Sequence, residues 1–200
     1  GAEHQLDCVL ARHRPQRLEV FCPGNHSIGK NWVIGAEVAI RLSERFGNRF
    51  RTTVRFLGER ASAEQHSRLD RLRDADHVRL IEGLPSDAEL LTLLEEADVV
   101  FLPYSPDWFR HRSSGLLTEA VLCGCRVVCL DDTYLAWVTC SAEIGSSLTE
   151  TSDIDAFVDA IAAEAERARR DRIMEREARI ARWKATSWET IHASLHRPIR

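Results

Sequence analysis

The sequence predicts an α/β fold: a doubly wound, Rossmann-like parallel sheet of about six strands, covered by helices. Strand-like and helix-like segments alternate along the chain from Leu18 onward. The strand segments are continuous apolar runs, which is typical of parallel strands that have both faces covered. Right-handed crossovers between such strands then place a ligand site at the carboxyl ends of the strands.

Six strands are expected from short apolar runs that end at glycine, proline or acidic residues. They span 18–22, 54–57, 77–81, 98–102, 127–130 and, with the weakest pattern, 144–148. Helices are expected where apolar residues recur three or four apart. They run from Trp32 to Gly47, over 63–73, after Ser86 or Asp87, from Ser113 or Ser114, over 134–138, and after Ser152 or Asp153. In the helix after Ser86, we expect Leu90, Leu91, Leu93 and Leu94 on the buried side.

The two ends of the chain differ from this alternating middle. Residues 1–15 are mixed in composition and are interpreted as a linker or an added edge segment, so one domain is expected over 16–200. Residues 162–182 are rich in Ala, Glu and Arg and predict a helical tail. Trp183, Trp188 and Ile191 would give this tail apolar groups with which to dock.

Composition excludes several classes of protein. Of the 200 residues, 44% are hydrophobic and 29% are charged, as in ordinary soluble globular proteins. The net charge of -4 argues against a general nucleic-acid binder, which would usually be basic. No apolar run is long enough for a membrane span, and no secretory signal opens the sequence.

Six cysteines are interpreted as small buried thiols in a reducing compartment, which predicts a cytoplasmic location. The spacing of Cys123 and Cys125 does not fit a zinc knuckle or a thioredoxin motif. The histidines are scattered, so no metal site is expected. Asp131 and Asp132 resemble a metal-binding pair, but a cap for the following helix is the preferred interpretation.

The most informative stretch is 110–120, where a polar loop opens a helix. Ser113 or Ser114 can cap that helix, and the free N–H groups of its first turn attract an anion such as phosphate. Gly115 lets a ligand approach the backbone, and Glu119 lies one turn further on the same face. Arg110, His111 and Arg112 add positive or protonatable groups; they form the mouth of the candidate site. The alternative is a capped helix beside a solvated basic loop.

Loops after three strands should meet this stretch at one edge of the sheet. The loop after the first strand carries Gly24, Asn25 and Lys30, and the third strand ends at Gly83. Flanking glycines and asparagines favour phosphate binding by Lys30 over a solvated lysine at a helix start. Separate polar and glycine-rich stretches that converge on one edge predict a ligand site there.

The ordered set of segments resembles the carboxy-terminal, donor-binding half of a glycosyltransferase of GT-B architecture, most like glycosyltransferase family 4. The matching stretches are Val78–Gly83, Glu89–Leu91 with Ala97–Pro103, and Ser114–Val128, in which a glycine opens a helix and Glu119-Ala120 follows. The similarity covers roughly residues 18–165. It implies a nucleoside diphosphate sugar as substrate, sugar transfer with retention, no metal cofactor, and a role in polysaccharide biosynthesis.

The resemblance also assigns residues to roles. Glu119 matches the glutamate that holds the donor ribose, and Lys30 matches the lysine that meets the diphosphate; these two are the candidate catalytic residues. The backbone at Gly83 and Leu84 would receive the base. The amides of Ser114, Gly115 and Leu116 would meet the distal phosphate. The other candidate donor-binding residues are Gly24, Asn25, Arg110, His111, Arg112 and Ser113.

Two departures from the family leave alternatives open. The family usually has a first glutamate eight positions before Glu119, and this chain has His111 there. The arginine that the family carries beside the loop lysine is also missing, and Arg110 or Arg112 could substitute for it. The architecture further needs an N-terminal acceptor-binding domain that this chain has no room for. A non-catalytic nucleotide-sugar-binding or partner-docking module, or half of a nucleotide-sugar epimerase, therefore remains as an alternative.

Overall fold

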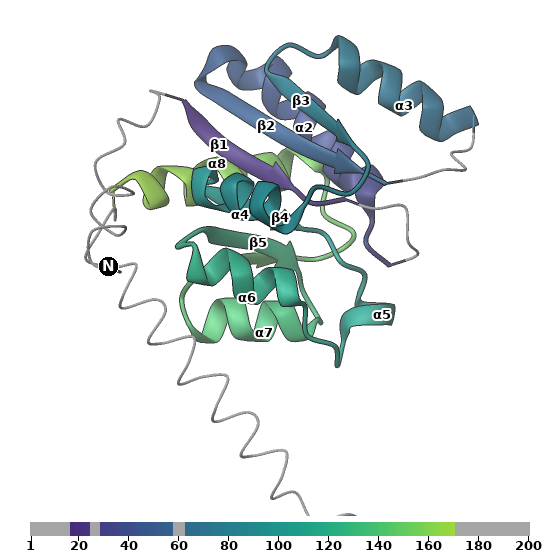
Figure 1. The fold of residues 1–200 in the computed structure, drawn as a ribbon. Coiled ribbons are helices and arrows are strands. Elements are labelled where there is room, and N and C mark those ends of the chain that lie inside the picture. The colour runs from purple at the N-terminus through teal and green to yellow at the C-terminus, as the bar shows by residue number, and fades with distance from the viewer. Residues whose placement is uncertain (1–16, 25–28, 58–62, 171–200) are drawn as a thin grey trace, which may run out of the picture.

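The computed structural model describes residues 17–24, 29–57 and 63–170, and its centre is a six-stranded, all-parallel sheet in the order β3-β2-β1-β4-β5-β6 (Figure 1). The strands are β1 (Leu18–Cys22), β2 (Phe50–Phe56), β3 (Val78–Glu82), β4 (Val99–Leu102), β5 (Arg126–Leu130) and β6 (Gly145–Leu148). This order is that of a doubly wound sheet, so the predicted fold class is confirmed.

Helices cover the sheet on two sides. One side carries α2 (Trp32–Phe46), α3 (Ala63–Asp74) and α8 (Ile154–Arg170), and the other carries α4 (Asp87–Glu96), α6 (Gly115–Leu122) and α7 (Tyr134–Ser141) (Figure 1). A short helix η1 (Gly47–Arg49) precedes β2, and a one-turn helix α5 (Pro106–Phe109) follows β4. The sequence did not indicate α5, because four residues are too few for a periodic pattern.

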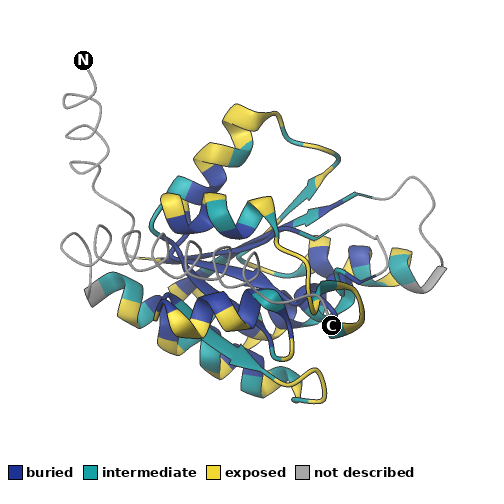
Figure 2. Ribbon diagram, turned by 90° about the horizontal axis from the view of Figure 1, so that it is seen from below, coloured by how far each residue is buried: buried dark blue, intermediate teal, exposed yellow. Residues whose placement is uncertain are grey.

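The sheet separates two apolar cores. Within β1, Leu18 and Val20 pack toward α2 and α8, whereas Phe21 packs toward α4 and α6. The central strands β1, β4 and β5 are buried along their whole length (Figure 2). Strands β2 and β3 are not, since Arg51 and Arg55 are half-buried and Arg79 is exposed on one face. The prediction that both faces would be covered throughout is therefore wrong at this edge.

Two strand boundaries differ from the prediction. β2 begins at Phe50, four residues before the predicted start, because Thr52 and Thr53 suit an extended backbone and pair in register with β1. β3 begins at Val78, since His77 has a φ of 63° and cannot continue a strand. In α4, Leu93 and Leu94 are buried as expected, but Leu91 is 49% exposed.

The helix caps follow the sequence in two cases and depart from it in a third. Ser86 forms a capping box with Glu89, and Asp153 accepts a hydrogen bond from the amide of Ala156 at 2.7 Å. The aspartates at 131–132 do not cap α7, contrary to the prediction. Thr133 does so, with its hydroxyl 3.0 Å from the amide of Ala136, because it stands three residues before that amide.

The cysteine prediction holds for the sheet only. Cys22, Cys125 and Cys129 are buried, and burial raises the pKa values of the Cys22 and Cys129 thiols to about 12. Cys123, by contrast, is only half-buried, and Cys140, in the last turn of α7, is exposed. Cys8, the segment 1–15 and the tail residues Trp183, Trp188 and Ile191 lie outside the described residues. Among the helices that the structure describes, none combines the length and the apolar character that a membrane crossing requires.

A buried ion pair attaches α8 to the sheet. The side chains of Arg126 on β5 and Glu164 on α8 are only 7% and 1% exposed, and they form a salt bridge. Glu164 also accepts hydrogen bonds from Ser146 on β6 and from Arg167, the latter at 2.9 Å. Removing one partner of a buried pair leaves the other charge without compensation, so this contact should be sensitive to mutation.

We expect Glu164→Ala to lower the free energy of unfolding by roughly 3–5 kcal/mol, because it removes the carboxylate that neutralises the buried Arg126 guanidinium. Glu166→Ala is the matched control on the same helix. Glu166 pairs with Arg49 at the surface, so its loss should cost under about 1 kcal/mol. Urea unfolding of both variants measures the difference, and equal losses would contradict the assigned role of Glu164.

A second buried carboxylate, that of Glu19, is less well satisfied. Its Oε2 accepts a hydrogen bond from Arg51 at 2.8 Å, but its Oε1 is buried with no hydrogen-bond partner in the described part of the chain. Burial raises the pKa of Glu19 more than the hydrogen bond from Arg51 lowers it, and Asp98 and Glu96 raise it further. The folded protein therefore binds a proton at Glu19 more tightly than the unfolded chain does.

It follows that the contribution of Glu19 to stability improves as the pH falls from neutral through its raised pKa. Glu19→Gln imitates the protonated form, so we expect the variant to be more stable than the wild type at pH 7. The expected gain in the free energy of unfolding is about 1.4 kcal/mol for each pH unit by which folding raises the pKa of Glu19. Thermal unfolding from pH 7 to pH 4.5 should show this advantage shrinking. Glu96→Gln, at an exposed position near the same arginine, should show a much smaller trend, because Glu96 is the weakest of the causes that raise the pKa of Glu19.

Candidate anion-binding site at the switch point of the sheet

The candidate site lies where β1 and β4 run side by side at the centre of the sheet. Val20 pairs with Val99, although the two residues are far apart in the sequence. From β1 the strand order continues to β2 and β3 on one side, and from β4 to β5 and β6 on the other. The loops after β1 and β4 therefore leave the same edge in different directions, which is the usual position of a ligand crevice in such sheets.

Lys30, in the loop after β1, is half-buried at this point. Its Nζ lies 5.5 Å from the centre of the Tyr104 ring, within the range of a cation–π interaction. Burial lowers the pKa of Lys30, and the nearby positive charge of Arg55 lowers it further. The ammonium group thus lies close to a second cation.

Tyr104 connects the two loops. It follows β4, is 2% exposed, and its hydroxyl shares a hydrogen bond with the side chain of Ser114 at the start of α6. Burial raises the pKa of Tyr104 to about 12, while the Ser114 hydrogen bond and the charge of Arg55 act in the opposite direction. The structure therefore brings Lys30 and Ser114, both predicted from the sequence, to the same side chain.

Ser114 is the N-cap residue of α6, but it does not cap the helix with its side chain as the sequence suggested. The hydroxyl is turned to Tyr104 instead. The first-turn amides of Gly115 and Leu116 have no acceptor within the helix, and no other described residue supplies one. A Cβ atom at Gly115 would meet open space, so a ligand can reach this backbone.

A tight contact between the two loops was not visible in the sequence. The amide of Ser105 donates to the carbonyl of Gly29 at 2.7 Å, and Trp108 of α5 packs directly over Gly29. A Cβ atom at Gly29 would lie 2.6 Å from the Trp108 ring, and the φ of Gly29 is 94°, so only glycine fits. Trp108 remains 46% exposed at the mouth, with the Arg112 guanidinium 6.0 Å from its ring.

Arg55 is the main residue that the sequence analysis missed. It lies near the carboxyl end of β2, and its Nε donates to the carbonyl of Gly24 at 3.3 Å. Gly24 itself approaches the Arg55 backbone closely, since a Cβ atom there would lie 2.8 Å from the Arg55 carbonyl. The alternation of the strand marked Arg55 only as a polar residue, and no sequence signal indicated which loop it would reach.

The other predicted residues are less constrained by the fold. Arg110, His111, Arg112 and Ser113 are exposed on the loop before α6, and Glu119 is exposed on α6 itself. Leu116 is half-buried. Asn25 lies outside the described residues. Across 17–24, 29–57 and 63–170, no three His, Cys, Asp or Glu side chains gather as metal ligands would.

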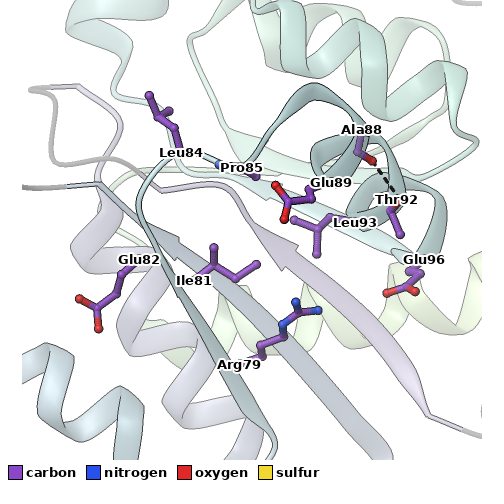
Figure 3. A pocket seen from close by; sticks show the side chains of 10 residues that line it. All are labelled: Arg79, Ile81, Glu82, Leu84, Pro85, Ala88, Glu89, Thr92, Leu93 and Glu96. Atoms are coloured by element: carbon purple, nitrogen blue, oxygen red, sulfur yellow. Dashed lines mark hydrogen bonds between the residues drawn. The ribbon is translucent and has the colours of Figure 1, made fainter.

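Gly83 and Leu84 end β3 at the open side of the sheet. Gly83 has a φ of 102°, its amide donates to the carbonyl of Phe56 at 2.9 Å, and Leu84 is 73% exposed. Below them, a groove of about 400 Å³ runs between β3 and α4 (Figure 3). This volume is in the range of small-molecule pockets.

Apolar and charged side chains line the groove together. Figure 3 shows Ile81 of β3 and Leu93 of α4 on opposite sides, with Glu89 between them and Leu84 pointing away. Arg79 and Glu96 lie toward the amino end of β3 and the carboxyl end of α4. The opening at Leu84 adjoins the position that the sequence analysis assigned to the base.

No known protein-family model matches this sequence, and no curated protein matches it closely enough to count as a relative. Solved structures do match its fold. The C-terminal domain of a group 1 glycosyl transferase family protein (LpcC) from Francisella tularensis superimposes with a TM-score of 0.61 at 13% identity, over 88% of this chain and 87% of that one. The trehalose-phosphate synthase of Burkholderia xenovorans superimposes with a TM-score of 0.60 at 13% sequence identity. The match covers 93% of this chain and 43% of the synthase.

A third match is WaaG, a glycosyltransferase involved in lipopolysaccharide biosynthesis, with a TM-score of 0.57 at 15% identity over 92% of this chain. The present chain spans only 44% of WaaG, so it corresponds to part of that protein. At these identities the comparison establishes the fold alone. The fold of this chain is that of the C-terminal domain of GT-B glycosyltransferases.

Proposed function

We propose that this chain is the donor-binding domain of a glycosyltransferase, similar to family 4, that transfers a sugar from a nucleoside diphosphate sugar with retention. The observation that carries the proposal is the joining of Lys30 to the start of α6 through Tyr104, at the switch point of a GT-B-type sheet. A cation and unused helix amides at one place fit a diphosphate.

Sugar transfer places negative charge on the departing nucleoside diphosphate. Lys30 supplies a fixed positive charge where that diphosphate would lie, and the amides of Gly115 and Leu116 supply hydrogen-bond donors with the helix dipole behind them. These groups need no reorganisation as the charge develops. In this proposal the protein stabilises the leaving group through its own cations and amides, without a metal cofactor.

The rest of the donor would extend along the same edge of the sheet. Glu119 lies one turn beyond Gly115 on the exposed side of α6, where its carboxylate can accept hydrogen bonds from ribose hydroxyls. The base would lie against the backbone at Gly83 and Leu84. The acceptor would be held by an N-terminal domain outside this chain, which is supported by the 44% of WaaG and the 43% of the trehalose-phosphate synthase that the chain spans.

The cellular setting is part of the same proposal. The described cysteines are free thiols, as expected in a reducing cytoplasm. Together with the fold, this supports a cytoplasmic enzyme of polysaccharide biosynthesis.

A binding screen by titration calorimetry is the direct test. One matching structure is described as bound with UDP-2-fluoro glucose, so UDP and UDP-sugars are the first probes, followed by the other nucleoside diphosphates and their sugars. Binding of at least one of them at micromolar to low millimolar concentration is expected. Failure of every nucleotide to bind would overturn the donor-binding assignment.

The roles of Glu119 and Lys30 can be separated with two ligands. We expect Glu119→Gln to weaken both uridine and UDP about tenfold, because both carry the ribose whose hydroxyls it would hold. Lys30→Ala should weaken UDP by roughly ten- to a hundredfold and leave uridine nearly unchanged, since uridine has no phosphate.

Salt dependence provides the control for this pair. Binding of UDP to Lys30→Ala should depend less on ionic strength than binding to the wild type, because the lost contact is ionic. Equal losses of both ligands in Lys30→Ala would show that Lys30 supports its loop. Unchanged binding in Glu119→Gln would remove α6 beyond its first turn from the site.

We also expect UDP to bind without a divalent cation, because the groups at the switch point are cationic and would repel one. Calorimetry in the presence of a chelator should give an affinity within about twofold of that in magnesium or manganese, a difference of under roughly 0.5 kcal/mol. Loss of binding with chelator and recovery with either metal would contradict this part of the proposal.

A further inference from the structure

Three arginines lie on the same face of the two outer strands, and their surroundings differ. On β2, Arg51 and Arg55 are four residues apart and point to the same side, because side chains alternate along a strand. Arg79 of β3 pairs in register with Thr53, which lies between them. The face that these residues share is the one on which α4 lies.

Two of the three have carboxylates near them. Arg51 is 2.8 Å from Glu19 and 3.8 Å from Glu96. Arg79 lies near Glu89; the hydrogen bonds from Ser86 are the main cause of the lowered pKa of that carboxylate, and Arg79 adds to them. Nearby carboxylates therefore balance the positive charges of both Arg51 and Arg79.

Arg55 has no such partner. Its Nε donates to the Gly24 carbonyl, and in the described part of the chain no carboxylate lies within ion-pair distance of it. Its terminal nitrogens are therefore available as a planar pair of donors. Its positive charge acts instead on the like charge of Lys30, whose pKa it lowers.

Two cations in a half-buried place repel each other, so the arrangement costs free energy in the empty protein. A ligand with more than one negative charge would relieve that repulsion. Gly24, whose carbonyl Arg55 contacts, lines a hollow of about 10 Å³ together with Lys30 and Tyr104, and this hollow has room for about one water molecule. It is too small for a phosphate group, so the anion would lie outside it, between the two side chains.

We propose that Arg55 is a second diphosphate-binding residue, which holds one phosphate group of the donor through its terminal nitrogens while Lys30 holds the other. Arg55 would take the place of the arginine that is missing from the loop after β1, although Arg55 comes from strand β2. The exposed arginines at 110 and 112 are then not needed for this contact. The identity of the anion, a donor diphosphate, rests on the proposed function. Its negative charge is inferred from Arg55 and Lys30 alone.

The test uses inorganic pyrophosphate and UDP as separate probes in calorimetric titrations at two ionic strengths. Arg55→Gln should weaken both by about ten- to a hundredfold, and Arg55→Lys, which keeps the charge but loses the planar fork, by a smaller factor. Arg79→Gln is the matched control: it removes an arginine from the same face of the neighbouring strand and should change either affinity by less than about twofold.

A role of Arg55 in merely holding Gly24 gives a different pattern. In that case Arg55→Gln would lower the affinity for uridine as much as that for UDP, and Arg55→Lys would not recover either affinity. The pH profile adds a separate measure. Because Arg55 lowers the pKa of Lys30, the loss of UDP binding at alkaline pH should move to higher pH in Arg55→Gln.

In the described part of the chain, Tyr104 and Glu150 are further ionisable groups near Lys30. Tyr104, with its pKa raised to about 12, stays neutral between about pH 8 and pH 11. Glu150 of the loop after β6 accepts a hydrogen bond from the side chain of Asn31, next to Lys30.

The outcomes also separate this inference from the proposed function. Pyrophosphate binding that depends on Arg55, without binding of any nucleotide, would support the anion site and contradict the donor role. UDP binding that is equal in the wild type and Arg55→Gln would overturn the assignment of Arg55 and leave the donor role standing. Failure of the wild type to bind pyrophosphate and UDP would overturn this inference.

Discussion

The candidate site depends on the burial of one aromatic ring, that of Tyr104. The ring lies directly after the central strand β4, where parallel pairing with β1 fixes its position. Its face is turned to Lys30 and its hydroxyl to Ser114, so one side chain sets the separation between a cation and a helix start. A buried hydroxyl needs a hydrogen-bond partner, and here Ser114, which makes no side-chain cap for its own helix, is next to it.

This choice of partner has a chemical consequence. An N-cap serine that bonded to its own helix would use one of the first-turn amides. Because Ser114 bonds to Tyr104 instead, the amides of Gly115 and Leu116 stay open toward the edge of the sheet. Without a side-chain cap, α6 lacks one stabilising hydrogen bond and keeps an additional first-turn amide available to a ligand.

The two sides of the sheet differ in how their charged side chains are paired. On the β5–β6 side, the buried pair of Arg126 and Glu164 holds α8 against the sheet. On the β2–β3 side, the face toward α4 is partly open, and its arginines are matched by carboxylates except at Arg55. The buried ion pair thus lies on the side of the sheet away from the groove, and the partly open face lies beside the candidate site.

The sequence by itself determined the fold class and pointed to part of the candidate site. Continuous apolar runs such as Val99–Leu102 require burial on both faces, and alternation with helices then leaves few topologies besides a doubly wound sheet. Lys30 and Ser114 were found because glycines and serines beside an apolar run mark a strand end and a helix start, which are local features. Tyr104 was not found, because a tyrosine in a loop has no local signal of its burial.

Only the tertiary structure decided which side chains meet. Arg51, Arg55 and Arg79 are alike in the sequence, each a polar position in a strand. Strand order and register place Arg51 beside Glu19 at one end of β2 and Arg55 beside Gly24 and Lys30 at the other. The physical reason is that electrostatic partners here come from separate strands and loops, so their distances depend on the packing of the whole sheet.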